Sequence, residues 1–270
     1  MRRPWIVFLL ASAAAAQDAD LAAMAANVRD YATKFRLIAI GRPAVPHLMP
    51  QVASDDKALA FESASALRWI AHHAKERRAL AEETAAWCAE RHPAPVRVLA
   101  AEILGDLAVP STIGTLSAMV KGDDETSRAA VDALRRIADP AAGDALVGCI
   151  RGTPALRGPI LLALGARRDR RVLPVLLEVA REGDVHAIAA LGDAGFAEAE
   201  DDLVRLHRDG RPGAFDALVR VGAAAGSGPL LARAWHVAGD AGEKRAVLEA
   251  AAGLERFEPR IVVLLDAAQG

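Results

Sequence analysis

Cysteine and histidine residues in the first third of the chain have the types and spacing that could hold a metal ion. Cys88 and His92 lie four residues apart, about one helical turn, and His72 and His73 end the preceding helical pattern. A thiolate and two imidazoles that converge suit Zn²⁺. The spacing fixes no fourth ligand, and a cysteine next to Trp87 is also typical of a packed helix face. Cys88 therefore has two interpretations, a metal ligand and a buried apolar residue.

The remaining residues form no catalytic constellation. The sequence has no Gly-x-Ser-x-Gly motif, no His-Glu-x-x-His motif and no phosphate-binding loop that ends in Lys-Ser or Lys-Thr. The only other cysteine, Cys149, is not expected to pair with Cys88, because the pattern described below places them two repeats apart. We predict a protein without enzymatic activity and without a cofactor, unless the Cys88 cluster binds a metal ion.

Arginine is most concentrated in a short segment that we call the basic corner, formed by Arg167, Arg168, Arg170 and Arg171. Arg135 and Arg136 lie about one repeat earlier and would be near this corner if the repeats stack. Such a group of cations could dock an acidic partner or anionic headgroups. A run of charges more often belongs to a loop that simply faces water, and this is the alternative interpretation of the corner.

Helices must position these residues, because apolar residues recur at spacings of three and four and no alternating strand pattern competes. One leucine repeats at intervals of 30, 30, 27 and 27 residues, at Leu104, Leu134, Leu164, Leu191 and Leu218. A second leucine follows each of these by twelve residues, at Leu116, Leu146, Leu176, Leu203 and Leu230. Each period holds two helical patterns and a turn. This predicts an all-α fold, an α-solenoid of antiparallel helix pairs.

Turn and proline residues divide the pattern into elements. We expect a lone leading helix over 18–40, a first pair over 43–53 and 57–71, and a second over 75–91 and 95–107. Further pairs follow, about seven in all over residues 17–270. The copy near Ala252 has lost its leucine, which is typical of a degenerate C-terminal cap.

The repeated motifs resemble HEAT repeats, and within them the short bacterial type often called phycobilisome-lyase-like. The matching residues are the second-helix ends Ala133-Leu134-Arg135 and Ala163-Leu164-Gly165, the Asp139-Pro140 corner, and the first-helix openings Val45-Pro46-His47-Leu48 and Val172-Leu173-Pro174-Val175-Leu176. The resemblance covers about residues 40–264. It implies a stacked helical scaffold, and repeats of this type serve in scaffolds, adaptors and a few enzymes.

Residues 1–16 have the composition of a secretory signal peptide. Arg2 and Arg3 precede an apolar run from Trp5 to Ala16, and small residues lie just before Gln17. The run is shorter than the roughly 20 residues needed to span a bilayer, which disfavours the alternative of an N-terminal membrane anchor. We therefore predict a secreted or periplasmic protein of the cell envelope, with no stable membrane span after cleavage.

The overall composition fits one helical domain, with 53% hydrophobic, 25% charged and only 4% aromatic residues. The formal net charge of −2 disfavours nucleic acid as a partner, because binding to nucleic acid depends on neutralising phosphates. The expected function is a scaffold that binds a protein partner along the concave face of the solenoid, formed by the second helices. A long preformed surface of this kind loses little ordering entropy on binding.

Candidate contact residues occupy surface positions of the second helices, at Arg68, Asp132, Arg135, Arg136 and Asp216. Trp69 and Trp235 could be interface anchors, although such residues are more often part of the core. Two alternatives remain. One is a lyase-like or metal-dependent enzyme subunit that uses Cys88, His92 and His72. The other is a structural component of an envelope assembly, which predicts self-association.

Overall fold

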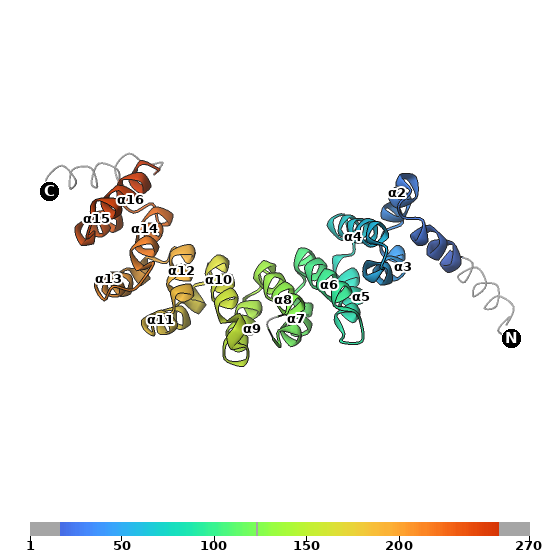
Figure 1. Ribbon diagram of the computed structural model, residues 1–270, viewed down its shortest axis with the longest axis horizontal. Coiled ribbons are helices and arrows are strands. Elements are labelled where there is room, and N and C mark those ends of the chain that lie inside the picture. The colour runs from blue at the N-terminus through green and yellow to red at the C-terminus, as the bar shows by residue number, and fades with distance from the viewer. Residues whose placement is uncertain (1–16, 123, 254–270) are drawn as a thin grey trace, which may run out of the picture. The chain divides into compact units, whose positions relative to one another are not determined.

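A computed structural model describes residues 17–122 and 124–253 of this chain, and these residues form an all-α fold without strands. Figure 1 shows the helices following one another along each part of the chain. The predicted signal peptide over residues 1–16 lies outside the described residues, as does the end of the predicted C-terminal cap beyond residue 253. Within the described residues, no helix combines the length and the apolar character needed to cross a membrane.

The contacts within the chain divide it into two compact units, where the sequence indicated one uninterrupted domain. The first unit contains residues up to 119 together with 124–133, and the second contains 120–123 and the residues from 134 onward. Helix α8 (Glu125–Arg136) contributes residues to both. No linker is needed for such a division, because repeated helix pairs make contacts mainly with their neighbours in sequence.

The first unit begins with a helix over residues 17–26. The elements that follow are α2 (Tyr31–Ile40), η1 (Arg42–Ala44), α3 (Val45–Leu48), η2 (Met49–Ala53), α4 (Lys57–His72), α5 (Arg77–Ala85), η3 (Ala86–Cys88), α6 (Ala94–Leu107), η4 (Pro110–Thr112) and α7 (Ile113–Met119). Helix α4 packs against both α2 and α6, and α5 packs against α6. Prolines 43, 46 and 50 each lie in a first turn, which explains why this stretch is a series of short helices.

The second unit continues with α9 (Pro140–Gly152), η5 (Pro154–Leu156), α10 (Arg157–Arg167), η6 (Arg170–Val172), α11 (Leu173–Arg181), α12 (Val185–Ala194), η7 (Ala197–Ala199), α13 (Glu200–Arg208), α14 (Ala214–Ala224), α15 (Gly228–Val237) and α16 (Ala241–Ala252). Each even-numbered helix packs against the odd-numbered helix before it. The even-numbered helices also pack against one another in order, α10 on α12, α12 on α14 and α14 on α16.

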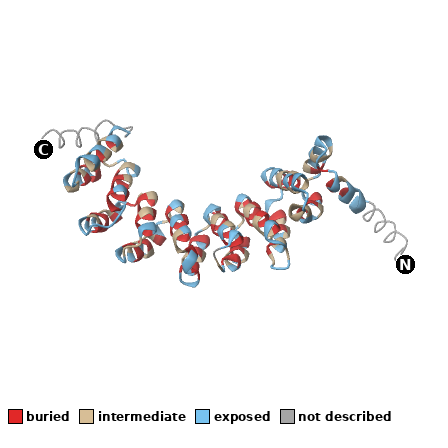
Figure 2. Ribbon diagram, viewed as in Figure 1, coloured by how far each residue is buried: buried red, intermediate tan, exposed pale blue. Residues whose placement is uncertain are grey.

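The repeating leucines form the centre of this packing. All five leucines of the first set are 0% exposed, and so are four of the five in the second set, the exception being Leu230 at 8%. Figure 2 shows the buried residues on the sides where helices meet. At roughly 25 cal/mol per Å² of apolar surface removed from water, this shared core stabilises helices that are too short to persist alone.

The leading helix differs from its expected form. Residues 18–40 were expected to form one helix, but the helix over 17–26 ends before a turn, and α2 begins at Tyr31. The carboxylate of Asp30 accepts a hydrogen bond of 2.8 Å from the backbone N–H of Thr33, and this capping starts a new helix. The aspartate therefore interrupts what the apolar pattern suggested was continuous.

Candidate functional site

Aromatic side chains are exposed on two adjacent helices of the first unit. Tyr31 and Phe35 on α2 are 75% and 50% exposed, and Phe61 and Trp69 on α4 are 69% and 53% exposed. We call these four residues the aromatic surface. Among the described residues, five of the seven exposed large hydrophobic side chains lie between positions 31 and 69. This concentration is unusual, because exposed apolar residues scattered singly need no explanation but grouped ones mark interaction sites.

The helical period explains why these rings face outward. Helix α4 buries Ser63, Ala66, Leu67, Ile70 and Ala71. Phe61 lies nine residues before Ile70, two and a half helical turns, and so falls on the opposite side of the helix. Trp69 was expected to be a core residue more often than not, and the structure places it at the surface instead.

Polar contacts also join α2 to α4, the two helices that carry the aromatic surface. The ammonium of Lys34 donates to the Glu62 carboxylate at 2.6 Å and to the Ser65 hydroxyl at 2.8 Å. The rings of Tyr31 and Phe35 lie 4.5 Å apart between centroids. These contacts fix the two helices and pair the α2 rings, so the exposed rings require little ordering when a partner binds.

Trp69 is held by its own helix end. Its ring stacks on that of His73 with 5.1 Å between centroids and 9° between planes. The Nδ1 atom of His73 lies 3.0 Å from the Trp69 carbonyl oxygen, a hydrogen-bond distance. The indole therefore presents a fixed surface from the C-terminal end of α4.

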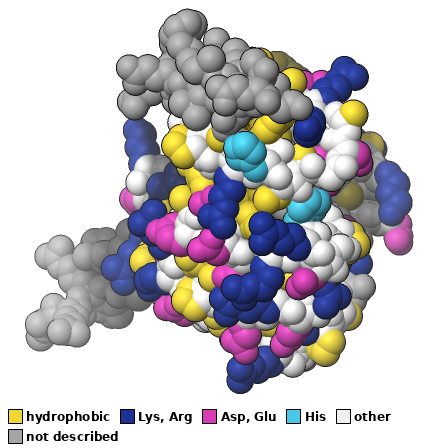
Figure 3. Space-filling model, turned by 90° about the vertical axis from the view of Figure 1, so that its left-hand side faces the viewer, with side chains coloured by type: hydrophobic (Ala, Val, Ile, Leu, Met, Phe, Trp, Pro, Cys, Tyr) yellow, Lys and Arg dark blue, Asp and Glu magenta, His cyan; other side chains and the backbone are white. Residues whose placement is uncertain are grey.

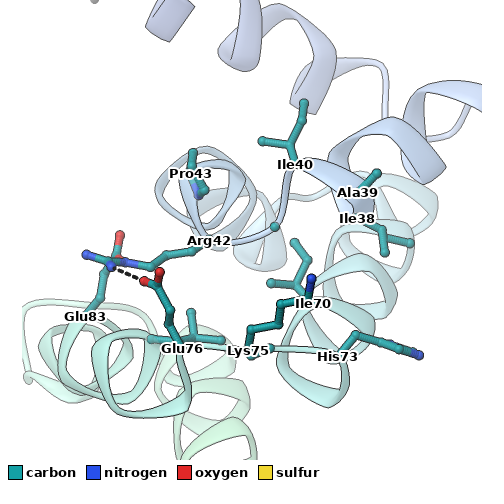
Figure 4. Close-up of a pocket in the computed structure, with 13 residues that line it drawn as sticks. Ile38, Ala39, Ile40, Arg42, Pro43, Ile70, His73, Lys75, Glu76 and Glu83 are labelled. Carbon is teal, nitrogen blue, oxygen red and sulfur yellow. Dashed lines mark hydrogen bonds and ion pairs between the residues drawn. The ribbon is translucent and has the colours of Figure 1, made fainter.

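A pocket of about 780 Å³ lies beside this end of α4. Its apolar wall is formed by Ile38, Ile40, Pro43, Ile70 and Leu80, which come from α2, η1, α4 and α5. Figure 4 shows these elements surrounding an open space. The volume falls within the range of about 300–1,000 Å³ that is typical of ligand sites.

Charged groups border the same pocket. The Arg42 guanidinium donates to the Glu83 carboxylate at 2.8 Å and to the Glu76 carboxylate at 3.2 Å, and the hydrogen bond to Glu83 is the main cause of the raised pKa of Arg42. Lys75 also lines the pocket, and it makes no ion pair or side-chain hydrogen bond within the described part of the chain. In Figure 4 the Lys75 side chain rises beside Ile70, while Arg42 extends toward the two glutamates.

Comparisons with known proteins add no family to these observations. The chain matches no protein-family model and no curated protein. The candidate site is therefore inferred from the described residues and their contacts.

Two of the predicted contact residues already form ion pairs with other residues of the chain. Arg68 on α4 donates to the Glu102 carboxylate of α6 at 2.6 Å. Asp216 on α14 pairs with Arg220 at 3.2 Å, and Arg220 also pairs with Asp193 of α12. Both predicted residues lie at the surface as expected, but their charges already have partners that join adjacent second helices.

The three predicted contact residues on α8 are also engaged by other residues of the chain. Arg135 and Arg136 line a second, smaller pocket of about 420 Å³, together with Arg167 and Asp169. The third, Asp132, is half-buried. The expected proximity of Arg135 and Arg136 to the basic corner is thus found within the second unit, although Asp169 offsets part of the positive charge there.

The basic corner is largely committed to internal contacts. Arg167 donates to the carbonyl oxygens of Leu134 at 2.9 Å and Asp139 at 2.8 Å, and also contacts that of Ile137. These carbonyls belong to the end of α8 and the turn after it, and burial lowers the pKa of Arg167. The guanidinium therefore satisfies backbone groups that the end of a helix leaves without partners.

The other three arginines of the corner differ in their contacts. Arg170 pairs with Glu198 at 3.1 Å, and Arg171 pairs with Asp169 at 2.8 Å, a hydrogen bond that is the main cause of the lowered pKa of the Asp169 carboxyl. Arg168 is exposed with a left-handed backbone at φ 52°, where it ends α10. Docking of an acidic partner at this corner would have to compete with most of these contacts.

The proposed metal cluster does not form. Among the described residues, no group of three or more histidine, cysteine, aspartate or glutamate side chains could hold a metal ion. Cys88 is a buried free thiol, and burial raises its pKa to about 12. His92 packs against Trp87 with 4.7 Å between ring centroids, and His73 packs against His72 and Trp69. These imidazoles are therefore held by aromatic packing. Cys88 is a buried residue and not a metal ligand in this structure, which agrees with the second of its two interpretations from the sequence.

Proposed function

We propose that this protein is an exported scaffold that binds a protein partner through the aromatic surface on α2 and α4. The proposal includes a HEAT-type solenoid made of the helix pairs, removal of the signal peptide, and a location outside the cytoplasm. The observation that carries it is the concentration of Tyr31, Phe35, Phe61 and Trp69 at the surface of one unit. Predicted surface charges elsewhere are paired within the chain, and so offer less to a partner.

Aromatic residues suit this role for physical reasons. Tyr and Trp provide a large apolar contact area with few rotatable bonds, so little side-chain entropy is lost in the complex. The four rings are exposed by half or more in the free chain. Covering them with a partner would remove apolar surface from water, which is the main driving force for protein association.

A capture experiment tests the proposal. The chain from Gln17 onward is immobilised and exposed to envelope extract, in wild-type form and as Phe61→Ser/Trp69→Ser. We expect a partner that the wild type retains and the double variant loses by at least tenfold. The matched control is Leu162→Ser, which removes an exposed apolar side chain from α10 in the second unit, 38% exposed in the structure. This control should retain the partner.

Two outcomes would count against the proposal. Equal capture by the wild type and the double variant, with helix content unchanged by circular dichroism, would remove the aromatic surface from the binding site. A mass that rises with concentration for wild type but not for Phe61→Ser/Trp69→Ser would show that the surface binds a second copy of this chain. The second result would support a structural role in an envelope assembly instead.

A further inference from the structure

We propose that the pocket beside the C-terminal end of α4 binds the C-terminus of a peptide, taking its last apolar side chain and its terminal carboxylate. This inference rests on the proposed function, because the peptide would be part of the same protein partner. The pocket is the largest of those described, at about 780 Å³. Its shape and its charges both point to this ligand.

The apolar wall gives the pocket room for one large side chain. Ile38 and Ile40 at the end of α2, Ile70 on α4 and Leu80 on α5 contribute branched or long aliphatic groups. Ile40 is 39% exposed, although it is a large hydrophobic residue. An apolar side chain placed against it would cover surface that the free chain leaves in contact with water.

The two cations that line the pocket differ in whether they already have an ion-pair partner. Arg42 is occupied by Glu83 and Glu76, at 2.8 and 3.2 Å. Lys75 makes no ion pair or side-chain hydrogen bond with any described residue. The Lys75 ammonium can therefore donate to a ligand carboxylate without breaking a contact that the described residues make, and such a charge-assisted hydrogen bond is stronger than a neutral one.

The two glutamates favour a peptide over a free alkyl carboxylate. A fatty acid carries one negative charge and no hydrogen-bond donor, so it could use Lys75 but not the oxygen lone pairs that Glu76 and Glu83 keep beyond their hydrogen bonds from Arg42. A peptide end brings backbone N–H groups as well, which can donate to these carboxylates while its terminus meets Lys75. The mixed lining has an apolar wall, two carboxylates that Arg42 only partly saturates, and one ammonium without a partner among the described residues, and it thus matches a peptide end.

The pocket is continuous with the aromatic surface. His73 lines the pocket and stacks on Trp69 at 5.1 Å, so the two sites share the end of α4. In Figure 4 the His73 side chain points away from the two glutamates, on the other side of Lys75. A partner that lies across the aromatic surface could therefore place its last residues in the pocket.

Fluorescence anisotropy with two short labelled peptides tests this inference. Both end in two leucines, one with a free carboxylate and one with a C-terminal amide. We expect saturable binding of the carboxylate form to the wild-type chain, and binding of the amide at least tenfold weaker. Lys75→Gln should abolish this difference. The control is Lys57→Gln, which changes an exposed lysine at the start of α4, outside the pocket, and should preserve the difference.

Several results would overturn the inference. One is equal binding of the acid and the amide, and another is no binding of either peptide. A third is an equal loss of peptide binding in the Lys57→Gln and Lys75→Gln variants. Displacement of the peptide by decanoate at an equal concentration would assign the pocket to alkyl carboxylates. If neither peptide binds but capture of the partner still requires Phe61 and Trp69, the scaffold proposal stands without the pocket. If the peptide binds but Phe61→Ser/Trp69→Ser captures the partner as well as the wild type does, the aromatic surface is not where the partner binds.

Discussion

The two units are built from the same repeated pattern but differ in what they leave at the surface. In the first unit, the exposed large hydrophobic residues of the described chain include four aromatic rings, whereas in the second they are only Leu162 and Val185. Figure 3, which views the molecule from the side of the C-terminal helices, shows cations and anions interspersed over that face. The same helical scaffold can thus carry a largely charged surface or an aromatic one, and the difference marks where binding is expected.

The second unit is also held together more closely between its second helices. A Cβ atom built on Gly165 of α10 would lie 2.5 Å from the Ala190 carbonyl oxygen of α12, and one on Gly192 would lie 2.9 Å from the Ala217 Cα atom of α14. Only a residue without a side chain permits these approaches. The contacts make this part of the chain a packed support, whereas α2 and α4 leave apolar surface for another molecule.

The largest loss of stability is expected when a side chain is added at one of these close contacts between helices. In Gly165→Ala the new methyl group meets backbone atoms of Ala190, so α10 and α12 must move apart. We expect the free energy of unfolding to fall by about 3 kcal/mol, measured by urea denaturation with circular dichroism. Gly148→Ala on α9 is the control, because nothing lies within 4 Å of its new Cβ. It should be stabilised by up to about 1 kcal/mol, and an equal loss in both variants would contradict the packing argument.

A second loss is expected when the cap on α8 is removed. Arg167→Met keeps the apolar stem but leaves the carbonyl oxygens of Leu134, Ile137 and Asp139 without their donor. We expect a loss of about 2 kcal/mol in the free energy of unfolding, with Arg167→Lys intermediate because an ammonium lacks the guanidinium fork. Arg168→Met, at the exposed neighbour, should change the value little; a similar loss there would show that net charge matters instead of capping.

A pH-dependent effect is expected at Asp202 of α13. Two hydrogen bonds from Arg181, at 2.9 and 2.8 Å, hold the pKa of this carboxyl below its usual value. The contribution to stability is present above the unfolded pKa of about 3.9 and is lost as pH falls through the lower folded pKa. Asp202→Asn should therefore lower stability by about 1 to 2 kcal/mol at pH 7, and less at pH 3.

Thermal unfolding of the Asp202→Asn variant at several pH values measures this dependence. Asp209→Asn, an exposed position at the end of the same helix, should show no comparable change with pH. A loss at Asp202 that is the same at pH 3 and pH 7 would mean that shape, and not charge, explains the contribution of this side chain.

The smallest effect on stability is expected at the aromatic surface. Phe61→Ser removes a ring that is 69% exposed, so we expect the free energy of unfolding to change by less than about 0.5 kcal/mol. Leu67→Ala, at a buried position of the same helix with 1% exposure, should lose about 3 kcal/mol. A large loss at Phe61 would give the ring a role in folding and weaken the argument that it serves a partner.

The core of the fold could be predicted from the sequence because its signal is local and repeated. The leucine intervals identified residues that are almost all completely buried, and most helix bounds lie within a few residues of those expected. The break before α2 was missed, because Asp30 is compatible with a helix surface as well as with a cap. Apolar periodicity does not distinguish these two roles.

The candidate site was less accessible from the sequence. Phe61 and Trp69 could have been found by comparing their helical positions with Leu67 and Ile70, which lie on the buried side. The ion pair between Arg68 and Glu102 could not have been found in this way, because Glu102 lies 34 residues away on a helix whose rotation depends on tertiary packing. The pocket is lined by α2, η1, α4 and α5, which are separated in the sequence, and it has no motif of its own.

Both cysteines are buried without a disulfide, and this has a kinetic consequence. Burial raises the pKa of the Cys88 thiol to about 12, so the reactive thiolate is scarce at pH 7. Oxidants and alkylating agents therefore reach this sulfur only when the surrounding helices open. The rate of alkylation at Cys88 therefore reports how often the first unit opens around this residue.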